Sequence, residues 1–98
     1  MLTLINNKNE SIRLTDERFS HIENDHPEMK EQLEKIKETL IGPDTVEVSK
    51  SDFSVELYYK FYGKTPVTSK YMCVIVKNAN SDKFIVTSYF TDKIKKGN

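Results

Sequence analysis

The sequence predicts an α+β domain in which two N-terminal helices pack on a four-stranded antiparallel sheet. Apolar residues recur at helical spacing in the first half of the chain and alternate with polar residues from Thr45 onward. Short polar segments separate the later apolar runs, which favours antiparallel neighbours because a parallel pair needs a long crossover. A length of 98 residues suits one domain, so residues 1–98 are treated as a single unit.

The first residues allow two interpretations. Residues 1–5 are mostly apolar, residues 6–10 are polar, and residues 11–14 alternate. This pattern fits either a short hairpin or a frayed leader followed by one strand. An extra N-terminal strand or hairpin is therefore allowed beside the four-stranded sheet.

Two helices are predicted within residues 16–41, with a break between His26 and Pro27. Thr15 is a cap-type residue followed by acidic side chains, which favour the positive end of a helix. Pro27 suits the first turn of a helix, so we expect the second helix to begin there. The second helix should stop at Gly42-Pro43, a common sequence of stop signals.

Four strands are predicted at residues 45–50, 55–62, 71–78 and 84–91. Period-2 alternation on the second strand puts Val55, Leu57, Tyr59 and Phe61 on one face and Tyr58, Lys60 and Tyr62 on the other. We expect the helices to cover the first set and leave the second set exposed. On the last strand, the same counting assigns Val86, Ser88 and Phe90 to the core and Thr87 and Tyr89 to the open face.

Charge is distributed unevenly, although the formal net charge is zero. Residues 1–49 carry 6 basic and 11 acidic side chains, and residues 50–98 carry 9 and 4. A basic half indicates an anionic partner, because local potential attracts a phosphate chain. The alternative is that the lysines lie along sheet edges and discourage edge pairing.

The composition also indicates a cytoplasmic protein. No run approaches the roughly 20 apolar residues of a membrane span, and the start lacks the apolar core of a signal peptide. A lone Cys73 cannot form an internal disulfide and fits a reducing compartment. Because it lies in an apolar run, we interpret it as a core residue rather than a nucleophile.

The two histidines are candidate acid–base groups. His21 and His26 are five residues apart and miss the i, i+4 spacing of a paired metal site, so neither a metal nor another cofactor is expected. An imidazole can accept and release a proton near neutral pH. His26 lies where one helix ends and the next begins, so its side chain can reach a cleft. For either residue, a structural role is the alternative.

The face expected to be open combines cations, hydroxyls and aromatic rings. It would carry Tyr58, Lys60 and Tyr62, with Thr87 and Tyr89 nearby. Aromatic rings can stack on bases while a lysine pairs with phosphate, as on many surfaces that bind single strands. The alternative is that the tyrosines are good strand formers that shield a half-exposed sheet.

Several segments together resemble the small bacterial and phage proteins grouped with the barnase, EndoU, colicin and RelE nucleases, which share the BECR fold. The resemblance spans Leu14 to Lys96. It is carried by residues 14–22, His26-Pro27-Glu28, residues 57–60, residues 74–77 and residues 86–92. The family architecture implies N-terminal helices followed by a four-stranded antiparallel sheet.

The resemblance implies a metal-independent endoribonuclease of toxin-like or phage-associated type. In such enzymes the 2′-hydroxyl of RNA attacks the adjacent phosphorus and leaves a cyclic phosphate, which requires an acid, a base and a cation. The implied catalytic residues are His21, His26, Lys60 and Thr87, and the implied substrate-binding residues are Tyr58, Tyr62, Tyr89 and Lys93. Lys60 stands where Arg is frequent in the family and offers a point charge rather than a bidentate fork.

Two further interpretations stay open. The fold can serve as a nucleic-acid-binding or protein-interaction module that lacks the chemistry. The basic half can also dock on an acidic protein, as in an antitoxin-like or structural partner. The expected partners are therefore RNA and an antitoxin or immunity protein.

Overall fold

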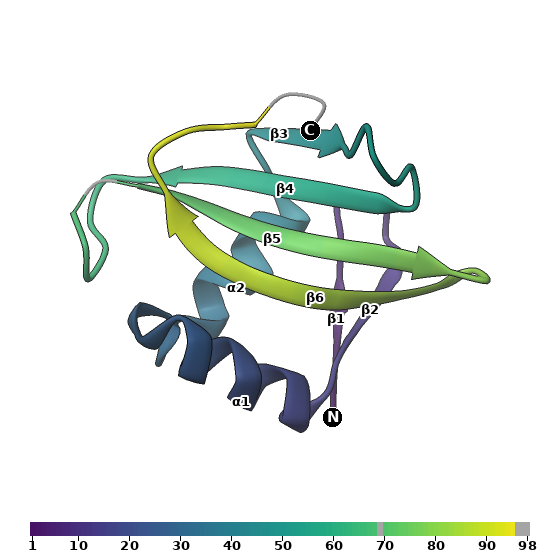
Figure 1. The fold of residues 1–98 in the computed structure, drawn as a ribbon, viewed down its shortest axis with the longest axis horizontal. Coiled ribbons are helices and arrows are strands. Elements are labelled where there is room, and N and C mark those ends of the chain that lie inside the picture. Colours follow the sequence, from purple (N-terminus) through teal and green to yellow (C-terminus); the bar gives the residue numbers. More distant parts are fainter. Residues whose placement is uncertain (69, 96–98) are drawn as a thin grey trace.

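The computed structural model describes residues 1–68 and 70–95. Within these residues the elements are β1 (Leu2–Ile5), β2 (Ser11–Leu14), α1 (Asp16–Asp25), the 3₁₀ turn η1 (Pro27–Met29), α2 (Leu33–Ile41), β3 (Thr45–Val48), β4 (Val55–Tyr62), β5 (Lys70–Ala79) and β6 (Asp82–Thr91). The strands of this part of the chain form one sheet in the order β1-β2-β6-β5-β4-β3 (Figure 1).

The predicted four-stranded antiparallel sheet is wrong, because the described residues form a six-stranded mixed sheet. Strands β3 to β6 pair antiparallel, and the N-terminal hairpin β1–β2 joins them through β6. The joint is parallel and consists of two residue pairs, Ile12 with Lys83 and Arg13 with Phe84. Local patterns do not reveal this pairing, since the whole α-helical region and three strands separate its two partners.

The helix boundaries have local causes. The Thr15 side chain caps α1 by accepting a hydrogen bond of 3.0 Å from the backbone N–H of Arg18, as the sequence predicted. The second helix, however, begins at Leu33 rather than at Pro27. Pro27 opens only a 3₁₀ turn, and Glu31 then takes a positive φ of 62°, which interrupts the helix. Gly42 ends α2 as predicted.

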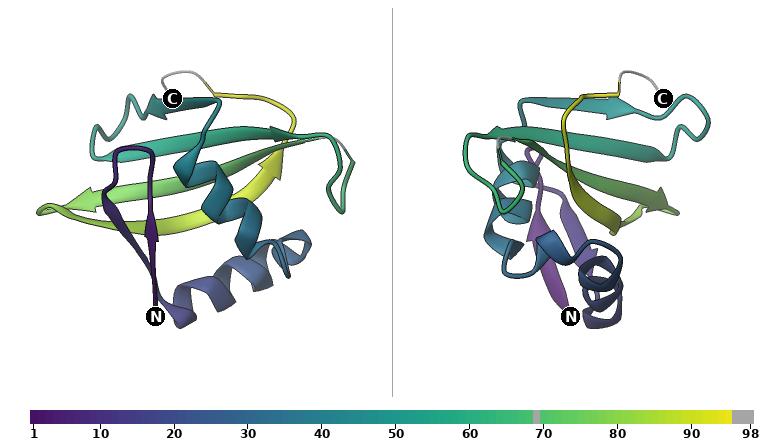
Figure 2. Two further views of the ribbon diagram at one scale, coloured as in Figure 1. Left: turned by 180° about the vertical axis from the view of Figure 1, so that it is seen from behind. Right: turned by 60° about the vertical axis from the view of Figure 1, so that its left-hand side comes forward.

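The helices and the hairpin lie on different parts of the sheet. Viewed from behind, α2 and the β1–β2 hairpin both cross the back of strands β4 to β6 (Figure 2). Helix α1 instead runs along β6 (Figure 1). It lies beside the part of β6 that continues beyond the two residue pairs with β2. We call the covered side the inner face and the opposite side the outer face.

The main hydrophobic core fills the inner face. Its buried residues come from the hairpin, the helical region and strands β4 to β6: Leu4, Ile12, Leu14, Ile22, Met29, Ile36, Leu40, Tyr58, Met72, Val74, Val76, Ile85 and Phe90. Tyr58 belongs to this core and is 1% exposed, so the predicted assignment of the two faces of β4 is wrong. Alternation separates the two faces of a strand, but it cannot tell which one the helices cover when both are rich in apolar residues.

A smaller apolar cluster lies on the outer face. Leu57, Tyr59 and Cys73 are buried there, and Val55, Tyr71, Ile75, Tyr89 and Ile94 pack around them. The C-terminal segment covers part of this cluster, because Ile94 packs on it and the backbone N–H of Lys95 donates to the Tyr59 hydroxyl at 3.2 Å. On β6, Ser88 and Phe90 face the core as predicted. Val86 does not, because the register shifts at this point of the β5–β6 pair.

Candidate functional site

The outer face carries an ordered row of side chains that ends at His26. Strand register places Thr45, Tyr59, Cys73 and Tyr89 opposite one another on neighbouring strands. The imidazole of His26 stacks on the Tyr89 ring, with 5.5 Å between ring centroids and 30° between planes. Helix α1 positions the imidazole, because the helix ends at Asp25 and the His26 N–H still donates to the Ile22 carbonyl at 2.8 Å.

A second pair of rings lies beside this row. Phe61 and Tyr71 face each other across β4 and β5 and make an edge-to-face contact with centroids 5.3 Å apart. Phe61 keeps half of its surface exposed and lies beyond the last residue of β4 that pairs with β3. We call Phe61, Tyr71, Tyr89 and His26 the aromatic patch. Phe61 was not predicted as a site residue because its face of β4 was assigned to the core, and alternation gives no side for Tyr71 because its strand is apolar on both faces.

Lysines border the aromatic patch at the end of β6. Lys93 is exposed and follows Thr91, whose hydroxyl accepts a hydrogen bond from the Lys93 N–H. Lys70 forms an ion pair with Asp92, so part of its charge is already compensated. Lys93 and the exposed Lys95 make no ion pair within residues 1–68 and 70–95, so both ammonium groups are available to an anionic ligand at this end of the sheet.

The structure divides the predicted site residues between the two faces. His26, Thr87 and Tyr89 come together at the outer side of β6, with Lys93 beyond its end. Tyr58, Lys60 and Tyr62 lie on the inner face. His21 is exposed on α1.

The inner-face residues have structural partners. The Lys60 ammonium donates to the Gly42 carbonyl at 3.2 Å, at the end of α2. The Tyr62 hydroxyl donates to the Glu38 carboxylate at 2.7 Å. Because Lys60 and Thr87 point to opposite sides of the sheet, they cannot flank one phosphate. The predicted catalytic arrangement is therefore not assembled.

The acidity of the outer-face groups limits their chemistry. Burial raises the pKa of the Cys73 thiol to about 11 and that of Tyr59 to about 12. Burial likewise raises the pKa of Tyr89, and the neighbouring Cys73 adds to the effect. At neutral pH these groups are protonated, so the tyrosines can stack or donate hydrogen bonds and Cys73 is not an activated nucleophile.

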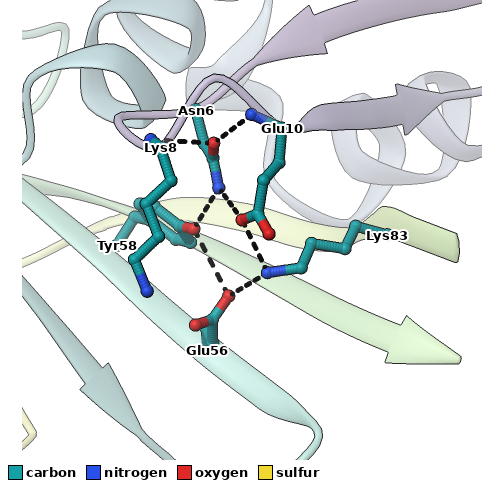
Figure 3. Close-up of polar contacts among 6 residues, drawn as sticks. All are labelled: Asn6, Lys8, Glu10, Glu56, Tyr58 and Lys83. Atoms are coloured by element: carbon teal, nitrogen blue, oxygen red, sulfur yellow. Dashed lines mark hydrogen bonds and ion pairs between the residues drawn. The ribbon is translucent and has the colours of Figure 1, made fainter. Parts of the chain in front are cut away.

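A separate polar cluster joins the hairpin to the sheet (Figure 3). Asn6 is almost fully buried, and its amide nitrogen donates to the Tyr58 hydroxyl at 2.9 Å and to Glu10 at 2.8 Å. Lys83 completes the cluster through ion pairs with Glu10 at 2.9 Å and Glu56 at 3.2 Å. Each group thus has a partner inside the cluster, as a structural anchor requires.

The ionisation of this cluster supports the same interpretation. Burial disfavours the charged form of Lys83, but hydrogen bonds to Glu10 and Glu56 outweigh it and raise the Lys83 pKa. The hydrogen bond from Asn6, followed by that from Lys83, lowers the pKa of Glu10. The cluster is therefore held in its ion-paired state rather than poised to exchange protons.

Neither a metal site nor a membrane span is found in the part of the chain that the structure describes. Its His, Cys, Asp and Glu side chains form no group of three or more that could hold a metal ion. None of its helices has the length and apolar character needed to cross a membrane.

No protein-family model, curated protein or solved structure matches this chain. The resemblance to the BECR nucleases therefore stays a prediction.

Proposed function

We propose that this protein binds single-stranded RNA on the outer face of its sheet. The observation that carries the proposal is the aromatic patch, which lies on the side of β4, β5 and β6 away from α2 and the hairpin, with Lys93 at its border. Flat rings on the exposed part of a sheet face can stack on unpaired bases, and a nearby cation attracts the backbone. The basic second half of the chain agrees with such a partner. A cytoplasmic location is part of this proposal.

The first test measures the affinity for a short single-stranded RNA with a fluorescent label. Phe61→Ala removes an exposed ring, and loss of one base stack of about 1–3 kcal/mol lowers affinity at least about fivefold. The matched control is Phe53→Ala, which removes a ring that is 81% exposed and precedes the opposite end of β4. Equal affinities for the two variants would remove the support for the aromatic patch. Single-stranded DNA of the same sequence tests whether the strand must be RNA.

A metal-independent endoribonuclease is the second candidate, and the position of His26 favours it. His26 lies on the same side of the sheet as Thr87 and stacks on Tyr89, so an RNA strand on the patch would meet an imidazole. His26 would exchange protons as the 2′-hydroxyl attacks phosphorus and the 5′-oxygen leaves, which yields a cyclic phosphate. Lys93, rather than the predicted Lys60, would be the cation that stabilises the negative charge on the phosphate during the reaction. An antitoxin or immunity partner belongs to this candidate.

Incubation with RNA in EDTA separates the two candidates. An endoribonuclease of this type cleaves RNA without metal, loses activity in His26→Ala and keeps it in His21→Ala, whose imidazole is exposed on α1. If Lys60→Ala abolishes cleavage, the assignment of the active site to the outer face is wrong, because Lys60 lies on the inner face. Binding without cleavage supports the RNA-binding function alone.

A further inference from the structure

A pocket of about 180 Å³ lies where β2 and β6 separate. The two strands pair at Ile12 with Lys83 and at Arg13 with Phe84, after which β2 turns into α1 while β6 continues. The space between them is lined by Arg13, Thr15, Arg18, Phe84 and Ile85. Neither the resemblance nor the aromatic patch accounts for it.

The side chains of the pocket suit a phosphate group. Arg13 pairs with Asp82 through Nε at 2.9 Å and through Nη2, and its guanidinium lies 6.0 Å from the centre of the Phe84 ring. A guanidinium has five N–H donors, so this pairing leaves others available. Arg18 has no ion pair with any residue of the described part of the chain. Both lining arginines can offer N–H donors, and guanidinium groups bind phosphate oxygens well.

The pocket and the aromatic patch lie at two ends of one path. Helix α1 and strand β6 run side by side in the same direction, since Thr15 and Arg18 meet Phe84 at the start and His26 meets Tyr89 at the end. The ten residues of α1 cover about 15 Å at 1.5 Å per residue. A stacked strand that advances about 3.4 Å per nucleotide spans this distance in about four steps, so with roughly five nucleotides.

We propose that the pocket lined by Arg13 and Arg18 binds a phosphate of the same RNA strand whose bases stack on the aromatic patch. This inference rests on the proposed RNA-binding function and adds a direction to it. The strand follows α1 along β6, and a minimum length of about five nucleotides is needed to occupy both ends. An RNA shorter than this reaches only one of them.

The test compares Arg18→Gln with Lys50→Gln, because Lys50 is exposed in the loop after β3 and makes no ion pair within residues 1–68 and 70–95. For an RNA of about eight nucleotides, Arg18→Gln lowers affinity several-fold and reduces the salt slope by about 0.7, the value for one phosphate contact. Lys50→Gln leaves both unchanged. For an RNA of about two nucleotides, Arg18→Gln binds as the wild type does.

Three other outcomes would overturn the inference in distinguishable ways. If Phe61→Ala weakens RNA binding while Arg18→Gln matches Lys50→Gln, the second subsite is wrong and the proposed function stands. If the wild type binds no RNA, the proposed function fails, and an NMR titration with inorganic phosphate examines the pocket by itself. If phosphate shifts the NMR signals of Thr15 and Phe84 in the wild type but not in Arg18→Gln, the pocket binds anions but has no role in RNA binding. If phosphate shifts neither signal, the pocket is not an anion site.

Discussion

Tyr58 and Tyr89 illustrate how the covered face of a strand decides the role of a residue. Both were predicted to bind substrate, and both are tyrosines on central strands. Tyr58 points into the main core and hydrogen-bonds with Asn6, whereas Tyr89 lies on the outer face beneath His26. The aromatic composition of this sheet could be predicted from the sequence. The side on which each ring lies could not, since both faces of β4 contain apolar and aromatic residues.

We expect Tyr58→Phe to affect stability rather than binding. The change removes a buried hydroxyl that accepts a hydrogen bond from Asn6 and donates one of 3.3 Å to Glu56. Loss of such a buried contact lowers the free energy of unfolding by about 1–2 kcal/mol, measured by urea titration. RNA affinity should equal that of the wild type. If Tyr58→Phe binds RNA more weakly while its stability is unchanged, Tyr58 belongs to the binding site.

Cys73 should react slowly in the folded protein. At about pH 8, a thiol with a pKa of about 11 is roughly a hundredfold less ionised than one with the ordinary value of 9.0. Burial on the outer face also blocks access to the sulfur. The rate of reaction with a chromogenic disulfide should therefore rise at least about a hundredfold when urea unfolds the chain. Similar rates in both states would contradict the burial of Cys73 on the outer face.

At the scale of elements, the strongest local signals were also the most reliable. The Thr15 cap and the Gly42 stop place the start of α1 and the end of α2, and both follow from backbone chemistry within a few residues. The start of α2 was misplaced because Pro27 suits a 3₁₀ turn as well as an α-helix. The β2–β6 pair was missed because it joins strands that are distant in sequence.

Acid should weaken the attachment of the β1–β2 hairpin to the sheet, because the ion pair between Glu10 and Lys83 needs an ionised carboxylate. The pKa of Glu10 is lowered in the folded protein, so its contribution is complete above the ordinary value of 4.5 and is lost as pH falls below it. We expect Glu10→Gln to be less stable than the wild type near neutral pH. The difference in stability, measured by thermal unfolding, should shrink as pH falls below 4.5 and through the lowered pKa of Glu10.

The control for this experiment is Glu34→Gln. This residue is exposed on α2, and its ion pair with Lys37 is 3.5 Å long. Exposed pairs of this kind contribute little, so the variant should resemble the wild type across the same pH range. A stability difference for Glu10→Gln that persists unchanged at low pH would contradict the anchoring role of its carboxylate.

For the whole molecule, the central feature is a sheet with two unlike faces. One face is closed by α2 and the hairpin and holds the main core. The other carries the aromatic patch, and α1 leads along its edge from the arginine pocket to His26. An α+β chain with a basic second half could be predicted from the sequence. The candidate site could be predicted only in part, because it depends on which long-range contacts close the inner face.

The most direct test of an outer-face site uses the isoleucine methyl groups as reporters in an NMR titration with single-stranded RNA. Ile75 and Ile94 lie on the outer face, Ile36 is buried in the inner core, and Ile41 is exposed at the end of α2. We expect RNA to shift the methyl signals of Ile75 and Ile94 and to leave those of Ile36 and Ile41 in place. Shifts confined to Ile41 and Ile36, with Ile75 and Ile94 unmoved, would contradict an RNA site on the outer face.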